Sequence, residues 1–267
     1  MKLIVAKEHL SKDSVPVLLR SEDNGRNWSK PKTLDLWKDS EKDHLYKNAA
    51  TPYYRRPDIL LMFPKRFMIK RRSPDPKWKI GGLSDIVFMS SRDGIHWDRR
   101  FREAFMRPGR DQLNWHDRAI EVGPGLVPTG EGEMSLYFIH HYRTDAVGIR
   151  RGVLREDGLV SVHANYKGGE LLTRPLVFAG DQLVINFSSS AAGSVRVELQ
   201  DSSGKPLAGY GLDSCDEIYG DQLNRAVRWK GKSDLKKQVG EAVRLRIVLR
   251  DADLFSFQFR STAKNAQ

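Results

Sequence analysis

The sequence predicts an all-β protein in two parts, a partial β-propeller over residues 1–160 followed by a β-sandwich over residues 161–267. Short runs rich in Val, Ile and Phe recur along the chain and are bounded by Gly, Pro, Asp or Asn. No stretch keeps the i, i+3, i+4, i+7 spacing of an amphipathic helix over three turns. Two segments of the N-terminal half also repeat one another, which is typical of a radial arrangement of blades.

Nine runs of strand length carry the β prediction. They are Val15–Leu19, Ile59–Phe63, Ile86–Ser90, Met134–Ile139, Gly148–Leu154, Leu183–Phe187, Ser194–Leu199, Val243–Leu249 and Leu254–Phe259. In the last run Phe255, Phe257 and Phe259 share one face, which is expected to be core. The best helical candidate is Lys230–Gly240, with Ser233 as a possible N-cap and one or two turns expected.

The repeated segments are Ser21–Trp28 and Ser91–Trp97, and each follows a strand-like run. In both, Asp can accept hydrogen bonds from turn amides, Gly can take a positive φ and Trp can pack between sheets. The pattern resembles the Asp box of sialidases and related propellers, so Asp23 and Asp93 are expected to be structural rather than catalytic. The N-terminal part holds strands for about three blades, fewer than a closed ring needs. The ring is therefore expected to be incomplete in this chain or closed by a partner.

From Ser161 onward the sequence pattern changes, and strand-like runs recur every 8 to 12 residues. Turn sequences at 203–206 and 230–232 separate them. This spacing predicts a β-sandwich.

The composition is that of a globular chain, with 39% hydrophobic and 30% charged residues. The formal net charge is +11, an excess that suits nucleic acid, acidic glycans or anionic lipid. Apart from Lys65–Arg72 and the 230–237 stretch, basic residues are interleaved with acids and form no helical stripe. A nucleic-acid partner is therefore not expected, and a solvated basic face is.

The single cysteine, Cys215, excludes an intrachain disulfide and a cysteine-based metal cluster. Acidic residues at 213, 216, 217 and 221 could bind calcium if they converge, but turn formation is the favoured interpretation. No metal or cofactor is expected. The apolar run Leu3–Ala6 is too short for a signal sequence or a spanning helix, so no membrane insertion is expected, and the oligomeric state stays open.

Several segments occur together in a characteristic order: Gly82–Asp85, Ser91–Gly94, Arg107–Gly109, Glu133–Tyr137, Leu154–Ser161, Gly168–Glu170, Ile218–Asp221 and Asp251–Ser256. As a set, over about residues 45–260, they resemble a bacterial group of glycosyl-hydrolase-like five-bladed propellers with a C-terminal sandwich. That group is related to the family-32 and family-43 glycoside hydrolases. The resemblance implies a carbohydrate-active protein whose relatives are usually exported. Members of the group carry further N-terminal blades, and the related hydrolases draw a nucleophile or base from the first blade, so that part is expected to be missing here.

Glycoside hydrolysis needs two carboxylates about 5 to 10 Å apart. Asp85 and Glu133 each open a strand-like run, so both can project into a central funnel, and both are candidate catalytic residues. The alternative for each is a solvated acid at a strand edge. Asp117 and Glu121 are weaker candidates.

A second cluster offers groups that suit sugar recognition, namely an aromatic platform, an imidazole, a carboxylate and a guanidinium fork. These candidate substrate-binding residues are Trp115, His116, Asp117 and Arg118. The alternative is a loop whose Trp fills a blade interface. No G-x-S-x-G, H-E-x-x-H or P-loop motif occurs.

Two functions follow, and both have a carbohydrate partner. The first is a glycoside hydrolase acting on a poly- or oligosaccharide, of acidic or sulfated type if the basic balance reflects the substrate. The second is a non-catalytic glycan-binding or scaffold protein built on a propeller fragment.

Overall fold

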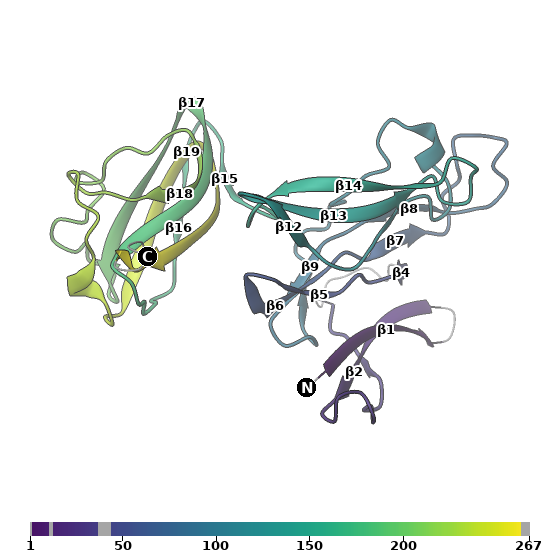
Figure 1. Ribbon diagram of the computed structural model, residues 1–267. Helices are drawn as coiled ribbons and strands as arrows, with labels where there is room; N and C mark the ends of the chain where they lie inside the picture. Colours follow the sequence, from purple (N-terminus) through teal and green to yellow (C-terminus); the bar gives the residue numbers. More distant parts are fainter. Residues whose placement is uncertain (1, 11–12, 37–43, 263–267) are drawn as a thin grey trace. The chain divides into compact units, whose positions relative to one another are not determined.

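The structure, a computed structural model, describes residues 2–10, 13–36 and 44–262, and these form strands β1–β19 with two short 3-10 helices. The prediction of an all-β chain is confirmed. The chain divides into two compact units, unit 1 (Met1–Leu154) and unit 2 (Arg155–Gln267) (Figure 1). The interpretation of these units as a propeller part and a sandwich remains a prediction.

The described residues of unit 1 form four sheets. The first joins β1 (Lys2–Leu10), β2 (Asp13–Ser21) and β3 (Lys32–Thr33). The second joins β4 (His44–Tyr46), β7 (Lys65–Met68) and β8 (Leu83–Ile86), and the third joins β5 (Thr51–Tyr53), β6 (Arg56–Met62), β9 (Met89–Ser91) and β10 (Trp97–Asp98). The fourth joins β11 (Glu121–Val122), β12 (Val127–Gly130), β13 (Glu133–His140) and β14 (Gly148–Arg155).

Two neighbouring segments of unit 1 cross between the second and third sheets, in opposite directions. Strand β6 gives way to β7 around Pro64, and β8 gives way to β9 around Val87. Proline has no N–H to donate to a ladder, and its carbonyl accepts from the Val87 amide at 3.1 Å. The expectation of one strand over Ile86–Ser90 is therefore wrong: the run is divided between β8, which pairs with β7, and β9, which pairs with β6.

A hydrophobic core lies where the sheets of unit 1 meet. Trp97 of the second repeated segment is 2% exposed and packs there with side chains from several strands and loops. Its buried partners are Leu18, Leu34, Leu45, Met62, Val87 and Met89. A buried Trp contributes a large apolar area, so the packing of this residue stabilises contacts between segments that are distant in sequence.

Unit 2 contains one hydrogen-bonded sheet of five strands among its described residues. These are β15 (Val162–Ala164), β16 (Gly169–Leu172), β17 (Gln182–Asp201), β18 (Asp221–Ala226) and β19 (Val243–Arg260). The long strands β17 and β19 pair antiparallel, with register shifts near Phe187 and between Ser189 and Ser194. Four predicted runs thus merge into two long strands, because bulges bend the strands without ending them.

The shift near Phe187 changes which side chains of β19 face the core. Phe257 and Phe259 pack against the core of unit 2, as expected. Leu254 is buried in that core, while Phe255 lies beneath the Arg155 guanidinium, 4.8 Å from its ring centroid. A one-residue slip reverses the two faces of a strand. The expectation of a continuous Phe face is therefore wrong at Phe255.

The expected helix in unit 2 is reduced to a single 3-10 turn, Lys236–Gln238. Leu235 occupies the N-cap position without a side-chain hydrogen bond. The expected cap, Ser233, instead accepts a hydrogen bond from the Gln182 side-chain amide at 3.0 Å. Its hydroxyl therefore joins the turn to β17.

Candidate functional site

The two repeated segments form turns with the same hydrogen-bond pattern. In each, a Ser hydroxyl donates to the Asp carboxylate and accepts from the Gly amide, and the Trp indole donates to the Gly carbonyl. Asp23 accepts from the Asn27 amide at 2.8 Å, and Asp93 accepts from the His96 amide at 2.8 Å. Both carboxylates are thus directed into their own turns.

Ionisation of these carboxylates is favoured by the same contacts. A hydrogen bond from His96 holds the pKa of Asp93 well below its ordinary value. The amide of Asn27 lowers the pKa of Asp23 in the same way. Acids held ionised in a turn have no proton to supply, which supports the structural role expected for them.

A cavity of about 950 Å³ lies in unit 1. This lies within the range of ligand pockets. Two of the sequence-predicted residues line it, Asp85 and Trp115. The other lining residues are Arg66, Met68, Arg71, Leu83, Ser84, Arg102, Ala104, Arg107, Pro108 and Gly109. We refer to this as the arginine cavity.

Asp85 is fixed on the wall of the arginine cavity by a cross-strand ion pair. Arg66 on β7 stands directly opposite Asp85 on β8. The guanidinium donates to both carboxylate oxygens, at 2.8 and 2.5 Å, and also to the Arg102 carbonyl at 2.9 Å. Such a bidentate pair fixes the orientation of both groups.

Trp115 is positioned by the short 3-10 helix Gln112–Asn114, whose C-cap it forms. Asp111 caps the other end by accepting from the Leu113 amide, and the Trp115 indole N–H donates to the Gly109 carbonyl at 2.6 Å. His141 lies 2.6 Å from the second Asp111 oxygen and links this helix to the end of β13. The indole is therefore held in one orientation and is half-buried.

The neighbours of Trp115 form a buried network. Asp117 is fully buried and accepts from Arg118 at 2.8 Å, Arg143 at 2.9 Å and the Trp78 indole at 3.2 Å. His116 is 3% exposed and stacks on Trp78 at 3.9 Å between centroids. Burial lowers the pKa of His116, so its ring is neutral at pH 7.

These three residues have surroundings different from those of Trp115. His116, Asp117 and Arg118 do not line the arginine cavity. Arg118 points its guanidinium over the Phe67 ring, 5.3 Å from the centroid. Of these four adjacent residues, only Trp115 lines the arginine cavity, while the other three belong to the network around Trp78 and Arg143.

Glu133 lies apart from Asp85 in the fold. It begins β13 at the β12–β13 hairpin, opposite Gly130, and is exposed. It does not line the arginine cavity. Among the described residues, Asp85 is the one carboxylate on that cavity wall.

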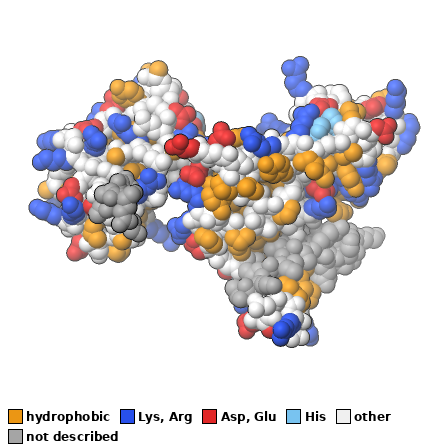
Figure 2. Space-filling view, in the orientation of Figure 1, with side chains coloured by type: hydrophobic (Ala, Val, Ile, Leu, Met, Phe, Trp, Pro, Cys, Tyr) orange, Lys and Arg blue, Asp and Glu red, His pale blue; other side chains and the backbone are white. Residues whose placement is uncertain are grey.

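Sequence reasoning missed a buried ion pair behind a second cavity of about 600 Å³. Lys65, 3% exposed, donates to Glu121 at 2.6 Å, and Lys47 pairs with the other oxygen of Glu121. Burial lowers the pKa of Lys65. Burial also opposes ionisation of Glu121, but hydrogen bonds from Lys47 and Lys65 outweigh it and lower the pKa. Figure 2 shows hydrophobic side chains gathered beside this region, over β12 and β13.

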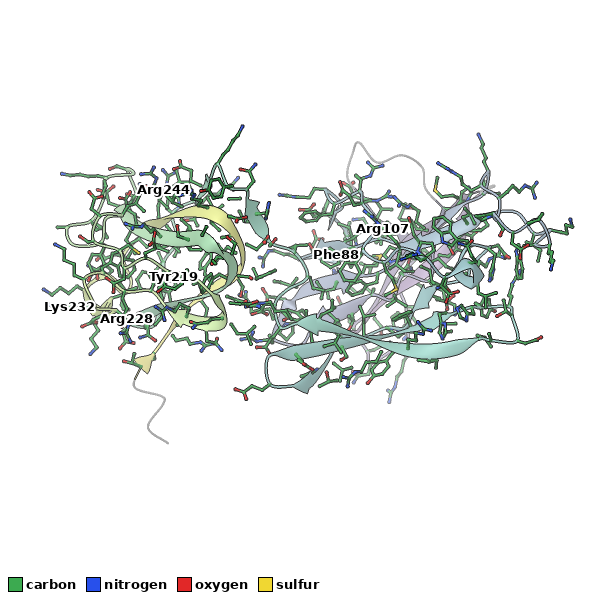
Figure 3. The ribbon with its side chains drawn as sticks, turned by 90° about the horizontal axis from the view of Figure 1, so that it is seen from above. Phe88, Arg107, Tyr219, Arg228, Lys232 and Arg244 are labelled. Carbon is green, nitrogen blue, oxygen red and sulfur yellow. The ribbon has the colours of Figure 1, made fainter. Side chains whose placement is uncertain are left out.

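Sequence reasoning also missed the arginines of the cavity wall. Arg71 belongs to the basic stretch that was expected to be solvated, and Arg107 to a segment noted for family resemblance alone. Arg107, labelled in Figure 3, extends from the loop that follows β10. The basic residues clustered at Lys65–Arg72 were the signal in the sequence for this cavity. The other segments that line the cavity, such as that of Arg107, are distant from this cluster in sequence.

Two further observations concern metals and membranes. Within residues 2–10, 13–36 and 44–262, no group of three or more His, Cys, Asp and Glu is placed to hold a metal ion. The same residues contain no helix long and apolar enough to span a bilayer.

No protein-family model matches the sequence, and no curated protein matches it. Among solved structures, the chain is similar to an arabinoxylan arabinofuranohydrolase of glycoside hydrolase family 43 from Bacillus subtilis, in complex with cellotetraose. The TM-score is 0.28 and the identity 12%, over 92% of this chain and 59% of that one. This chain thus spans about three fifths of the length of that protein. The resemblance to the five-bladed group remains a prediction from sequence.

Proposed function

We propose that unit 1 binds carbohydrate in the arginine cavity, with Trp115 as the platform for a sugar ring and the Asp85–Arg66 pair as the polar wall. The supporting observation is that a fixed indole and a fixed bidentate ion pair line one cavity of about 950 Å³. Sugar rings have apolar faces that pack on aromatic rings and hydroxyl edges that suit carboxylate and guanidinium groups.

Binding is favoured over hydrolysis because the candidate acidic residues are already held in ion pairs. Glycoside hydrolysis uses two carboxylates, one of which must carry a proton at the start of the reaction. Asp85 forms an ion pair with Arg66, Asp117 with two arginines and Glu121 with two lysines. Each of these acids is therefore held by a cationic partner, and for Glu121 the hydrogen bonds from Lys47 and Lys65 also lower the pKa.

Hydrolysis is the second candidate function, and the position of Asp85 on the cavity wall favours it. In that case Asp85 acts as an ionised, modulating carboxylate and Glu133 as the acid. This arrangement requires Glu133 to reach the substrate from the β12–β13 hairpin.

Calorimetric titration with a panel of neutral, uronic and sulfated oligosaccharides tests binding. Trp115→Ala is expected to weaken binding by about tenfold, because it removes the platform. Trp28→Ala is the matched control, since Trp28 lies in the first repeated turn, is 37% exposed and does not line the cavity. Equal affinities for Trp115→Ala and the native chain would refute this site.

Release of reducing ends from the same panel tests hydrolysis. Turnover that disappears in both Asp85→Asn and Glu133→Gln would establish the hydrolase and overturn the binding-only proposal. Binding without turnover in the native chain supports the proposal.

A further inference from the structure

The arginine cavity carries more positive than negative charge. Its walls include four arginines and, among the described residues, one carboxylate. Arg66 already forms an ion pair with Asp85. Arg71 and Arg107 differ from it: within the described part of the chain, neither side chain has a hydrogen bond or an ion pair.

Both unpaired arginines are anchored through the backbone to the strands that carry the Asp85–Arg66 pair. The Arg71 amide donates to the Met68 carbonyl at 3.0 Å, at the end of β7. Its carbonyl accepts from Gly82 at 2.8 Å, immediately before β8. On the other side, Met106 exchanges two hydrogen bonds with Ile86, at 3.0 and 3.1 Å, so Arg107 begins beside β8. The backbone positions from which the two arginine side chains extend are therefore fixed beside one cavity.

We infer that the arginine cavity selects carbohydrates that carry a carboxylate or sulfate group, which Arg71 and Arg107 bind. This inference rests on the proposed function and names its ligand class. A guanidinium presents a planar fork that matches a carboxylate or sulfate with two parallel hydrogen bonds. Trp115 on the same wall provides the surface for the ring that carries the acidic group.

The compact arrangement of cations around one tryptophan distinguishes this ligand from a polyphosphate backbone. Nucleic-acid binding uses several cations spread along an extended groove or stripe. Here the cations line one cavity, together with a single tryptophan among the described residues. A short acidic oligosaccharide fits that arrangement better than a duplex does.

The test compares matched ligands that differ only in charge: oligogalacturonate against its methyl ester, and a sulfated glycan fragment against its desulfated form. The native chain is expected to prefer each anionic member at least about tenfold, with the preference falling as salt is raised. In Arg71→Gln and in Arg107→Gln, the ratio of anionic to neutral affinity is expected to fall by about tenfold. Arg151→Gln, which removes the same charge from an exposed site on β14, should leave the ratio unchanged.

The outcomes separate this inference from the function on which it rests. Equal affinity for charged and neutral members, with binding still weakened in Trp115→Ala, overturns the inference and leaves the carbohydrate site intact. Arginine variants that behave like Arg151→Gln also overturn it, once thermal melting shows all three variants folded. Tighter binding of an oligonucleotide than of the acidic sugars overturns it as well. Failure of every sugar to bind refutes the proposed function.

Discussion

At the scale of single residues, Asp93 shows how one carboxylate closes a turn. It accepts from the amides of Ile95 and His96 at 2.9 and 2.8 Å and lies 2.6 Å from the His96 ring. Because the groups all lie within a few residues, the sequence pattern alone predicted this role. The neighbouring Trp97 then enters the core from a turn of fixed shape.

Asp93→Ala is expected to lower the free energy of unfolding by about 1 kcal/mol, since amide hydrogen bonds are lost at a partly exposed site. The pKa of Asp93 is lower in the folded state, so its contribution is present above its ordinary pKa of 3.8 and is lost as the pH falls below that value. Urea unfolding at pH 7 and pH 3 measures both effects. Asp145→Ala, at an exposed loop acid, is the control, and equal losses in the two variants would contradict the role of Asp93.

Lys65 and Glu121 form the residue-scale contact that the sequence did not reveal. They are 56 positions apart, on β7 and β11. Glu121→Gln is expected to destabilise the protein by about 3 to 5 kcal/mol, because it leaves the Lys65 ammonium buried without its counter-charge. Chemical denaturation measures the change against Glu131→Gln, an exposed acid in the β12–β13 hairpin. A loss no larger than that of the control would show that the pair contributes little.

Only part of the candidate site could be predicted from the sequence. Trp115 and Asp85 were found because their local sequences suggested a loop rich in recognition groups and a strand opening. The Asp85–Arg66 pair, and the neutralisation of Asp117 by Arg143, depend on pairings between segments that no local pattern encodes. Sequence therefore identified two residues of the cavity wall, while the cationic partners of Asp85 and Asp117 were revealed by the fold.

At the scale of elements, strand content was predictable and strand continuity was not. The period-two pattern located β13 closely, because Met134, Leu136 and Phe138 share one face of the strand. The same pattern separated single strands such as β17 into two, because a bulge resets the alternation as a turn does. The opposite error at β8 and β9 arose because one apolar run serves two sheets.

The bulge of β17 gives an element-scale prediction. A Cβ at Gly193 would clash with the Asp251 carbonyl oxygen of β19, so the position has no room for a side chain. Gly193→Ala is therefore expected to destabilise unit 2 by about 1 to 3 kcal/mol through displacement of the paired strand. The matched control is Gly169→Ala on β16, where the nearest contact is 3.5 Å. Thermal unfolding of the two variants distinguishes them, and equal stability would contradict the close approach.

At the scale of the whole molecule, each unit has a hydrophobic core of its own. One surrounds Trp97, and the other is built from β17 and β19 with side chains such as Val197, Leu245 and Ile247. Units with separate cores are expected to unfold in separate cooperative transitions. Calorimetry should therefore show Glu121→Gln lowering one transition and Gly193→Ala the other. A single transition moved by both variants would contradict this expectation.

The orientation of Trp115 has an optical consequence. Its indole is fixed by the Gly109 carbonyl and stands on the wall of the arginine cavity, whereas Trp97 and Trp229 are enclosed in the two cores. A ligand entering the cavity changes the polarity around this one lining indole. The difference in emission between the native chain and Trp115→Phe is thus a built-in spectroscopic signal of cavity occupancy, with no added label.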